Sequence, residues 1–90
     1  MRSQLMSVDA LAVSPDQQRL VTCDARGGLT IWDLQRRREL GTMHVGRTRR
    51  FRHVRFITND ILIGLSYHFV RQDTKWHVWS ASDWETNDEK

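Results

Sequence analysis

The sequence predicts an all-β fold of antiparallel four-stranded sheets, and three features of the chain indicate it. Turn-forming residues recur every few positions along the 90 residues. The short segments between these turns alternate apolar and polar residues or consist of β-formers, as half-buried strands do. The same order of segments then begins again half-way along the chain, which is the pattern of a repeated sheet. We therefore expect two successive sheets, each wound up and down.

The first expected sheet covers residues 8–45. Its strands are predicted at residues 8–13, 19–24, 29–34 and 39–45. Ser14-Pro15-Asp16 separates the first two strands, because proline presets the backbone of a turn. Gly27-Gly28 precedes the third strand and supplies the positive φ that a tight turn needs. These short turns indicate that each strand pairs with the one before it.

The second expected sheet covers residues 46–84 and repeats this order less completely. A basic connection at residues 46–50 leads into the sheet. Its strands are predicted at residues 51–57, 61–67 and 75–81, with a longer loop at residues 68–74. The chain then turns toward Trp84 and a polar end, so the fourth strand of this unit is barely started.

The two units form an imperfect internal repeat. Three matched pairs measure the repeat, at shifts of 43, 42 and 47 residues: Leu11 with Val54, Leu20 with Leu62, and Trp32 with Trp79. These shifts lie near the ~40–45 residues of a four-stranded propeller blade. Residues 1–7 are then a lead-in to the first unit, and residues 85–90 are a polar tail.

The residues of the first unit resemble a WD repeat. Val13-Ser14-Pro15-Asp16, Leu20-Val21-Thr22 and the segment from Gly28 to Asp33 follow the order of that family, and they include the Trp-Asp pair that names it. The second unit is similar but weaker, with Gly46-Arg47 where the family usually has Gly-His and Val78-Trp79-Ser80 where it ends in Trp-Asp. The resemblance implies about two antiparallel four-stranded blades of an incomplete β-propeller. It implies structural repeat positions at Thr22, Trp32, Asp33 and Trp79.

The chain also departs from the pattern of this family. In WD repeats a His, a Ser or Thr, an Asp and the Trp form a hydrogen-bonded network within the blade. The first unit keeps Thr22 and Trp32, but Arg26 stands at the Asp position and Gln4 at the His position. In the second unit Arg47 replaces the His. The resemblance therefore implies a divergent repeat whose stability depends mainly on packing.

Two blades cannot close a ring, so both outer sheet faces would be exposed to water. Exposed apolar faces of that size usually mark an interaction surface. Two interpretations follow. The chain is the C-terminal part of a longer propeller whose N-terminal segment supplies the last strand, or several copies assemble head to tail into a closed ring.

The composition is that of a cytoplasmic globular protein. Hydrophobic residues make up 39% of the chain and charged residues 28%, and the net charge is +3. Cys23 is the single cysteine, which excludes an internal disulfide and suits a reducing compartment. No apolar segment approaches the ~20 residues that cross a bilayer, and the first nine residues lack the apolar core of a signal peptide. We expect neither secretion nor membrane insertion.

Arginine dominates the expected binding surface, since twelve of the fourteen basic residues are arginine. In a four-stranded blade, the connection before the first strand and the connection between the second and third strands open on the same side. The basic connection at residues 46–52 would then meet the loop at residues 68–74. The candidate partner-binding residues are Arg47, Arg49, Arg50, Arg52, His68, Phe69 and Arg71. Forked guanidinium groups suit an acidic peptide, a phosphorylated segment or a nucleic-acid backbone. The alternative is a solvated loop that keeps the turn soluble.

Packing accounts for the other conspicuous side chains. Phe51 stands at an apolar position of the repeat, Trp32 and Trp79 occupy structural positions, and we expect Trp76 to pack as well. Cys23 lies within a predicted strand, which favours a buried thiol over a nucleophile.

No constellation in the sequence indicates an enzyme. The four histidines stand at no metal-ligand spacing with cysteine or carboxylate, and Gly27-Gly28 precedes a strand where a phosphate loop precedes a helix. We therefore expect no catalytic, metal or cofactor site. The predicted function is a non-catalytic scaffold that binds protein partners through its loop rims, and the alternative is a phosphate-binding or nucleic-acid-binding surface on residues 47–55.

Overall fold

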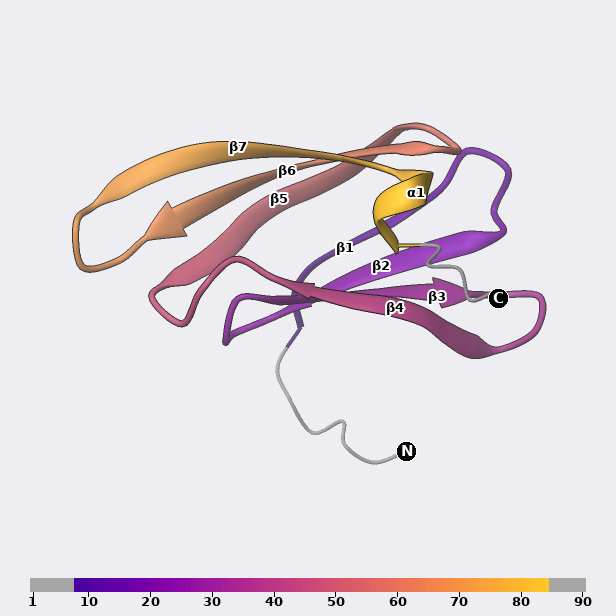
Figure 1. Cartoon of the computed structure of the whole chain (residues 1–90), viewed down its shortest axis with the longest axis horizontal. Helices are drawn as coiled ribbons and strands as arrows, with labels where there is room; N and C mark the ends of the chain where they lie inside the picture. The colour runs from indigo at the N-terminus through magenta and orange to yellow at the C-terminus, as the bar shows by residue number, and fades with distance from the viewer. Residues whose placement is uncertain (1–7, 85–90) are drawn as a thin grey trace.

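A computed structural model describes residues 8–84 and contains seven antiparallel strands and one short helix (Figure 1). The strands are β1 (Val8–Val13), β2 (Arg19–Asp24), β3 (Gly28–Asp33), β4 (Arg38–His44), β5 (Arg49–Thr58), β6 (Ile61–His68) and β7 (Asp73–Ser80), and the helix is α1 (Ala81–Trp84). The predicted lead-in, the predicted polar tail and Gln4 lie outside the described residues. The all-β prediction is confirmed.

The first sheet has the order β1-β2-β3-β4, as the turns predicted. The Ser14 hydroxyl donates to Asp16 over 2.6 Å and accepts the Arg19 N–H, which closes the first turn. At the second turn the Asp24 carboxylate accepts the N–H of Gly28, and Gly27 adopts a φ of 80°. A side chain at Gly27 would also collide with the backbone of the connection that follows β4. Both the positive φ and the lack of space for a side chain therefore require glycine at position 27.

The second sheet has the order β5-β6-β7, and its strands are longer than predicted. The ladder between β5 and β6 continues to Arg49 opposite His68, and the Phe69 N–H donates to the Thr48 carbonyl over 3.0 Å. The predicted loop at residues 68–74 is therefore a tight turn at residues 69–72. The arginine-rich segment at residues 47–55 is a loop only at its start, because β5 begins at Arg49, two residues before the predicted strand.

The two sheets lie as two layers, and β5 packs against β1 and β2 (Figure 1). One face of each sheet is buried in the shared core. The buried apolar side chains of that core are Val21, Cys23, Leu29, Ile31, Phe51, Phe56, Leu62 and Trp84. Arg50 on β5 pairs with Asp9 on β1, and the Asp16 N–H donates to the Asn59 amide oxygen, so the layers are also joined near both ends.

Helix α1 stands where a fourth strand of the second sheet could have begun. Trp84 is buried in the core, with its ring at 90° to that of Phe56 and the ring centroids 6.2 Å apart. The sequence placed Trp84 at the beginning of a polar end, and its core position was missed. Within residues 8–84 the second sheet has three strands. The same residues contain no helix with the length and apolarity needed to cross a membrane.

Both outer sheet faces carry exposed apolar side chains. Leu11 on β1 is 60% exposed, and Trp76 and Val78 on β7 are 62% and 68% exposed. Leu11 pairs across to Thr22, on the face opposite buried Val21 and Cys23. The expected packing role of Trp76 is wrong, because the alternation of β7 directs it away from the core.

Candidate functional site

A hydrogen bond between Trp32 and Thr22 crosses the outer face of the first sheet. The Trp32 indole N–H donates to the Thr22 hydroxyl over 3.1 Å. Thr22 pairs directly with Thr30, so the Trp32 ring reaches Thr22 diagonally, from two residues further along β3.

Asp33 follows Trp32 and closes the next turn by accepting the N–H groups of Gln35 and Arg36. The hydrogen bond from the Arg36 N–H lowers the pKa of Asp33 below its ordinary value, despite partial desolvation.

Trp79 occupies the position on the third strand of its sheet that Trp32 occupies in the first sheet, but its neighbours differ. It pairs with Leu62 as Trp32 pairs with Leu20. Gly64 stands where the first sheet has Thr22, and a Cβ there would lie 2.8 Å from the Phe51 ring. Trp79 instead packs against Phe51, with centroids 5.8 Å apart, and stacks on His77 at 5.4 Å. An aromatic cluster replaces the hydroxyl at this position.

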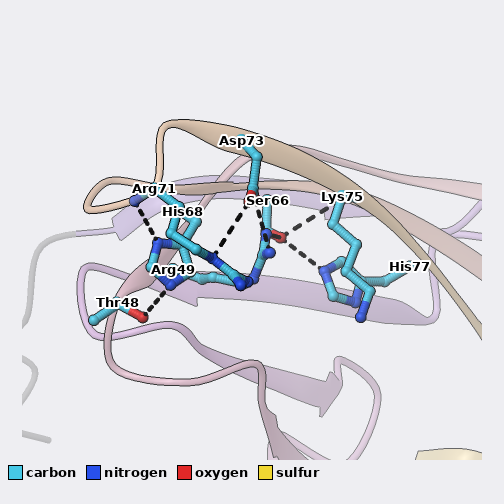
Figure 2. A network of polar contacts seen from close by, with 8 residues as sticks. All are labelled: Thr48, Arg49, Ser66, His68, Arg71, Asp73, Lys75 and His77. Carbon is cyan, nitrogen blue, oxygen red and sulfur yellow. Dashed lines mark hydrogen bonds and ion pairs between the residues drawn. The ribbon is translucent and has the colours of Figure 1, made fainter.

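The polar contact of the second sheet joins Ser66, two residues after Gly64 on β6, to His77, two residues before Trp79 on β7 (Figure 2). The Ser66 hydroxyl oxygen and His77 Nε2 are 2.7 Å apart. Ser66 pairs directly with Lys75, so His77 reaches it by the same diagonal that Trp32 uses to reach Thr22. Ser66 is fully buried, which keeps its hydroxyl from any substrate in solution.

Arg49 completes this network and is buried, contrary to its predicted place on the rim. Its guanidinium donates to the Ser66 hydroxyl over 3.1 Å and to the Asp73 carboxylate over 2.9 Å (Figure 2). Strand β5 begins at Arg49, two residues before the predicted strand, and its alternation turns Arg49 inward beside buried Phe51. Sequence reasoning missed Ser66, Asp73 and His77 altogether. The sequence feature that could have indicated this network is Ser66, a polar residue inside the otherwise apolar strand predicted at residues 61–67.

His77 is held in its neutral form. Burial, together with the nearby charges of Lys75 and Arg49, lowers the pKa of His77 below 6.5. Desolvation disfavours the imidazolium cation, and two neighbouring cations add to that effect. His77 therefore serves as an uncharged hydrogen-bonding partner of Ser66.

His68 and Arg71 hold the end of the hairpin between β6 and β7. The Arg71 backbone N–H donates to His68 Nδ1 over 3.0 Å, so the proton of a neutral ring lies on Nε2. His68 Nε2 is 2.9 Å from the Thr48 hydroxyl. The Arg71 side chain pairs with Asp73 at 3.5 Å. The predicted meeting of the two connections is confirmed, and these two residues organise it.

Arg50, Arg52 and Phe69 line one open hollow of about 420 Å³, together with Asp9, Phe51 and Tyr67. Both Arg50 hydrogen bonds to Asp9 measure 2.9 Å, and this carboxylate raises the pKa of Arg50. The Arg52 guanidinium lies over the Tyr67 ring, 4.4 Å from its centroid. Phe69 is 48% exposed at this hollow. Within residues 8–84 no carboxylate pairs with Arg52, which makes it the available cation of the hollow.

Arg47 is separate from the other predicted binding residues. It lines a second hollow of about 540 Å³ with Ala25, Arg26 and His44. The predicted cluster of seven residues therefore divides into three parts. Arg50, Arg52 and Phe69 share the first hollow, Arg49, His68 and Arg71 belong to the polar network, and Arg47 lies apart.

Cys23 packs in the core as the sequence predicted. It is fully buried, and burial, with smaller contributions from the nearby Asp24 and Asp9 charges, raises the pKa of the thiol to about 12. A thiol of this kind is a poor nucleophile at neutral pH. Among residues 8–84, no three His, Cys, Asp or Glu side chains are grouped so that they could hold a metal ion.

A scan of the chain against models of protein families and a search of curated proteins found no match. The class of protein that the fold defines is an all-β protein with two packed antiparallel sheets.

Replacing Arg49 with methionine is expected to destabilise the protein by about 1–3 kcal/mol, since a buried hydroxyl and a carboxylate each lose a donor. The same change at exposed Arg55, on the same strand, should alter the free energy of unfolding by less than about 0.5 kcal/mol. Urea unfolding of both variants measures the difference. Equal stability of the two variants would contradict a structural role for Arg49.

Stability is expected to fall as the pH drops below about 6.5, because His77 takes up a proton in the unfolded chain more readily than in the folded one. The contribution of His77 is fully present above the unfolded pKa and is lost as the pH falls toward the lower folded pKa. Urea unfolding between pH 7.5 and pH 5.5, about one unit on either side of the ordinary histidine pKa, tests this dependence. A His77→Asn variant should flatten the dependence, whereas exposed His53→Asn should leave it intact. An undiminished fall in the His77 variant would assign the effect to other groups.

Proposed function

We propose that the chain is a non-catalytic protein-binding segment, built as about two blades of an incomplete WD-repeat β-propeller. The observation that carries the proposal is the exposure of apolar side chains on the outer faces of both sheets. In a propeller each such face is covered by the next blade. The common diagonal of Trp32 with Thr22 and of His77 with Ser66 supports two copies of one repeating unit.

The outer faces also differ in charge, which favours stacking in one direction. Glu39 on β4 stands opposite Trp32. On the other sheet, His53 and Arg55 line a hollow of about 290 Å³ beside Trp76. If a neighbouring blade presented an outer face like that of the first sheet, the carboxylate equivalent to Glu39 would approach His53 and Arg55. Complementary charge of this kind fixes orientation and partner choice more than it adds affinity.

Tandem chains test the propeller proposal. Two or three copies joined end to end should unfold at higher temperature than one copy, because each junction covers an outer face. A gain of about 1 kcal/mol would raise the midpoint by roughly 4–8 °C for a domain of this size. Calorimetry or circular dichroism measures the midpoint.

The tandem experiment has a matched control. Replacing Trp76 and Val78 with lysine in every copy should remove the gain, since charged side chains then line the junction. Lysine at Val70, which is as exposed as Val78 but lies in the turn after β6, should leave the gain intact. A midpoint that is independent of copy number would refute stacking of the outer faces.

A phosphate-binding or nucleic-acid-binding surface is the second candidate, and the hollow around Arg52 favours it. Arg52 has no carboxylate partner within residues 8–84, and it lies over the Tyr67 ring in a hollow that half-exposed Phe69 also lines. Proteins bind single strands by combining cations with aromatic rings on which bases stack. Arg50 contributes less, because Asp9 neutralises it.

Arg52→Gln tests the second candidate without disturbing the buried network, which a change at Arg49 would disrupt. Binding of an oligothymidine is measured by fluorescence anisotropy over a salt series. The variant should bind more weakly and with a smaller salt dependence, whereas Arg47→Gln should bind as the unchanged chain does. If the oligothymidine shows no salt-dependent binding to the unchanged chain, the second candidate is refuted, and these arginines only keep the surface solvated.

A further inference from the structure

The second sheet ends at an open edge. Its last strand, β7, pairs with β6 on one side only, whereas the equivalent strand of the first sheet, β3, is covered by β4. In Figure 1 β7 forms the boundary of its layer. After Ser80 the chain enters α1, which contacts β4 of the other sheet. Within residues 8–84 nothing occupies the place beside β7.

This edge is long and regular. The ladder between β6 and β7 joins eight residue pairs without a bulge, from Ile61 opposite Ser80 to His68 opposite Asp73. Alternate peptide groups of an edge strand direct their N–H and C=O groups away from the sheet. Natural edges are usually blocked by proline, bulges or several charges. β7 contains no proline, and its two charged residues, Asp73 and Lys75, leave the stretch from Trp76 to Ser80 without Asp, Glu, Lys or Arg. The backbone of β7 is therefore suited to pairing with another strand.

The side chains of β7 indicate what kind of strand would fit. Trp76 and Val78 stand on the outer face, opposite Leu65 and Ile63 on β6, and remain largely exposed. Apolar residues at alternate positions of an added strand would cover their open sides. Lys75 lies on the opposite face and is exposed. An acidic residue between the apolar ones would face it.

We propose that β7 binds an extended segment of a partner polypeptide, with apolar and acidic residues in alternation, as the fourth strand of the second sheet. The first sheet supports this arrangement within the same molecule, because β3 binds β4 through six residue pairs at the corresponding edge. Main-chain hydrogen bonds supply affinity in this mode of recognition, and alternate side chains supply specificity. The inference rests on the proposed protein-binding function and names the chemistry of the partner.

A capped octapeptide of alternating valine and glutamate is the probe. Amide hydrogen exchange of the full chain should slow in β7 when this peptide is added, and exchange in β1 and β4 should stay unchanged. Lys75→Glu should weaken binding about tenfold, and it should strengthen binding of a matched valine–lysine peptide to a similar extent, as expected for one charge pair. Arg38→Glu, the same charge change in the other sheet, should leave both affinities unchanged.

Three results would overturn the inference. One is unchanged exchange in β7 at saturating peptide, and another is equal response of the Lys75 and Arg38 variants. The third is a dimer, detected by sedimentation, that protects β7 and that the peptide does not dissociate, since the occupant would then be a second copy. If tandem chains gain stability but the peptide does not slow amide exchange in β7, only the edge inference is refuted. A protected β7 in chains that gain no stability in tandem would refute only the stacking of blades.

Discussion

Each sheet buries one face against the other, and this constraint determines most of the molecule. Side chains alternate between the two faces of a strand, so the residues that build the core fix which residues stay outside. Val21 and Cys23 on β2 face the second sheet, and Leu62 on β6 faces the first. Leu11 and Trp76 are exposed as a consequence of the same alternation. The packing thus determines which side chains face outward, whereas the apolar character of Leu11 and Trp76 is a separate property of the sequence. A partner that covers these faces would extend the existing stack.

The buried guanidinium of Arg49 follows from the same constraint. A charge inside a sheet costs free energy unless hydrogen bonds and an opposite charge compensate it. Ser66 and Asp73 supply both, and neutral His77 completes the network without adding a second cation. The most inward arginine of the basic segment is therefore structural. Arg52, in contrast, is exposed, and its guanidinium lies over the Tyr67 ring.

The sequence predicted the parts of the fold that local chemistry determines. Turns at Ser14 to Asp16 and at Gly27 depend on residues close together in the chain, and the first sheet matches its prediction to within one or two residues. The buried position of Cys23 was predicted from its place within a strand, and that of Phe51 from its apolar position in the repeat. The network around Arg49 was missed because it depends on where β5 begins, and a shift of one residue exchanges the two faces of a strand. Trp84 was missed because its core position comes from packing between the sheets and lies beside polar sequence.

The two sheets differ in where the polar contact between their second and third strands lies. In the first sheet Thr22 lies beneath Trp32, and β4 covers the edge. In the second sheet Gly64 leaves space for the Phe51 ring, so the polar contact moves toward the hairpin at the end of β6. That hairpin then positions Phe69 beside the hollow that Arg52 lines. Because no strand covers β7 within residues 8–84, the second sheet combines an organised rim with an open edge. A partner that engages both would be recognised by charge at the rim and by backbone pairing at the edge.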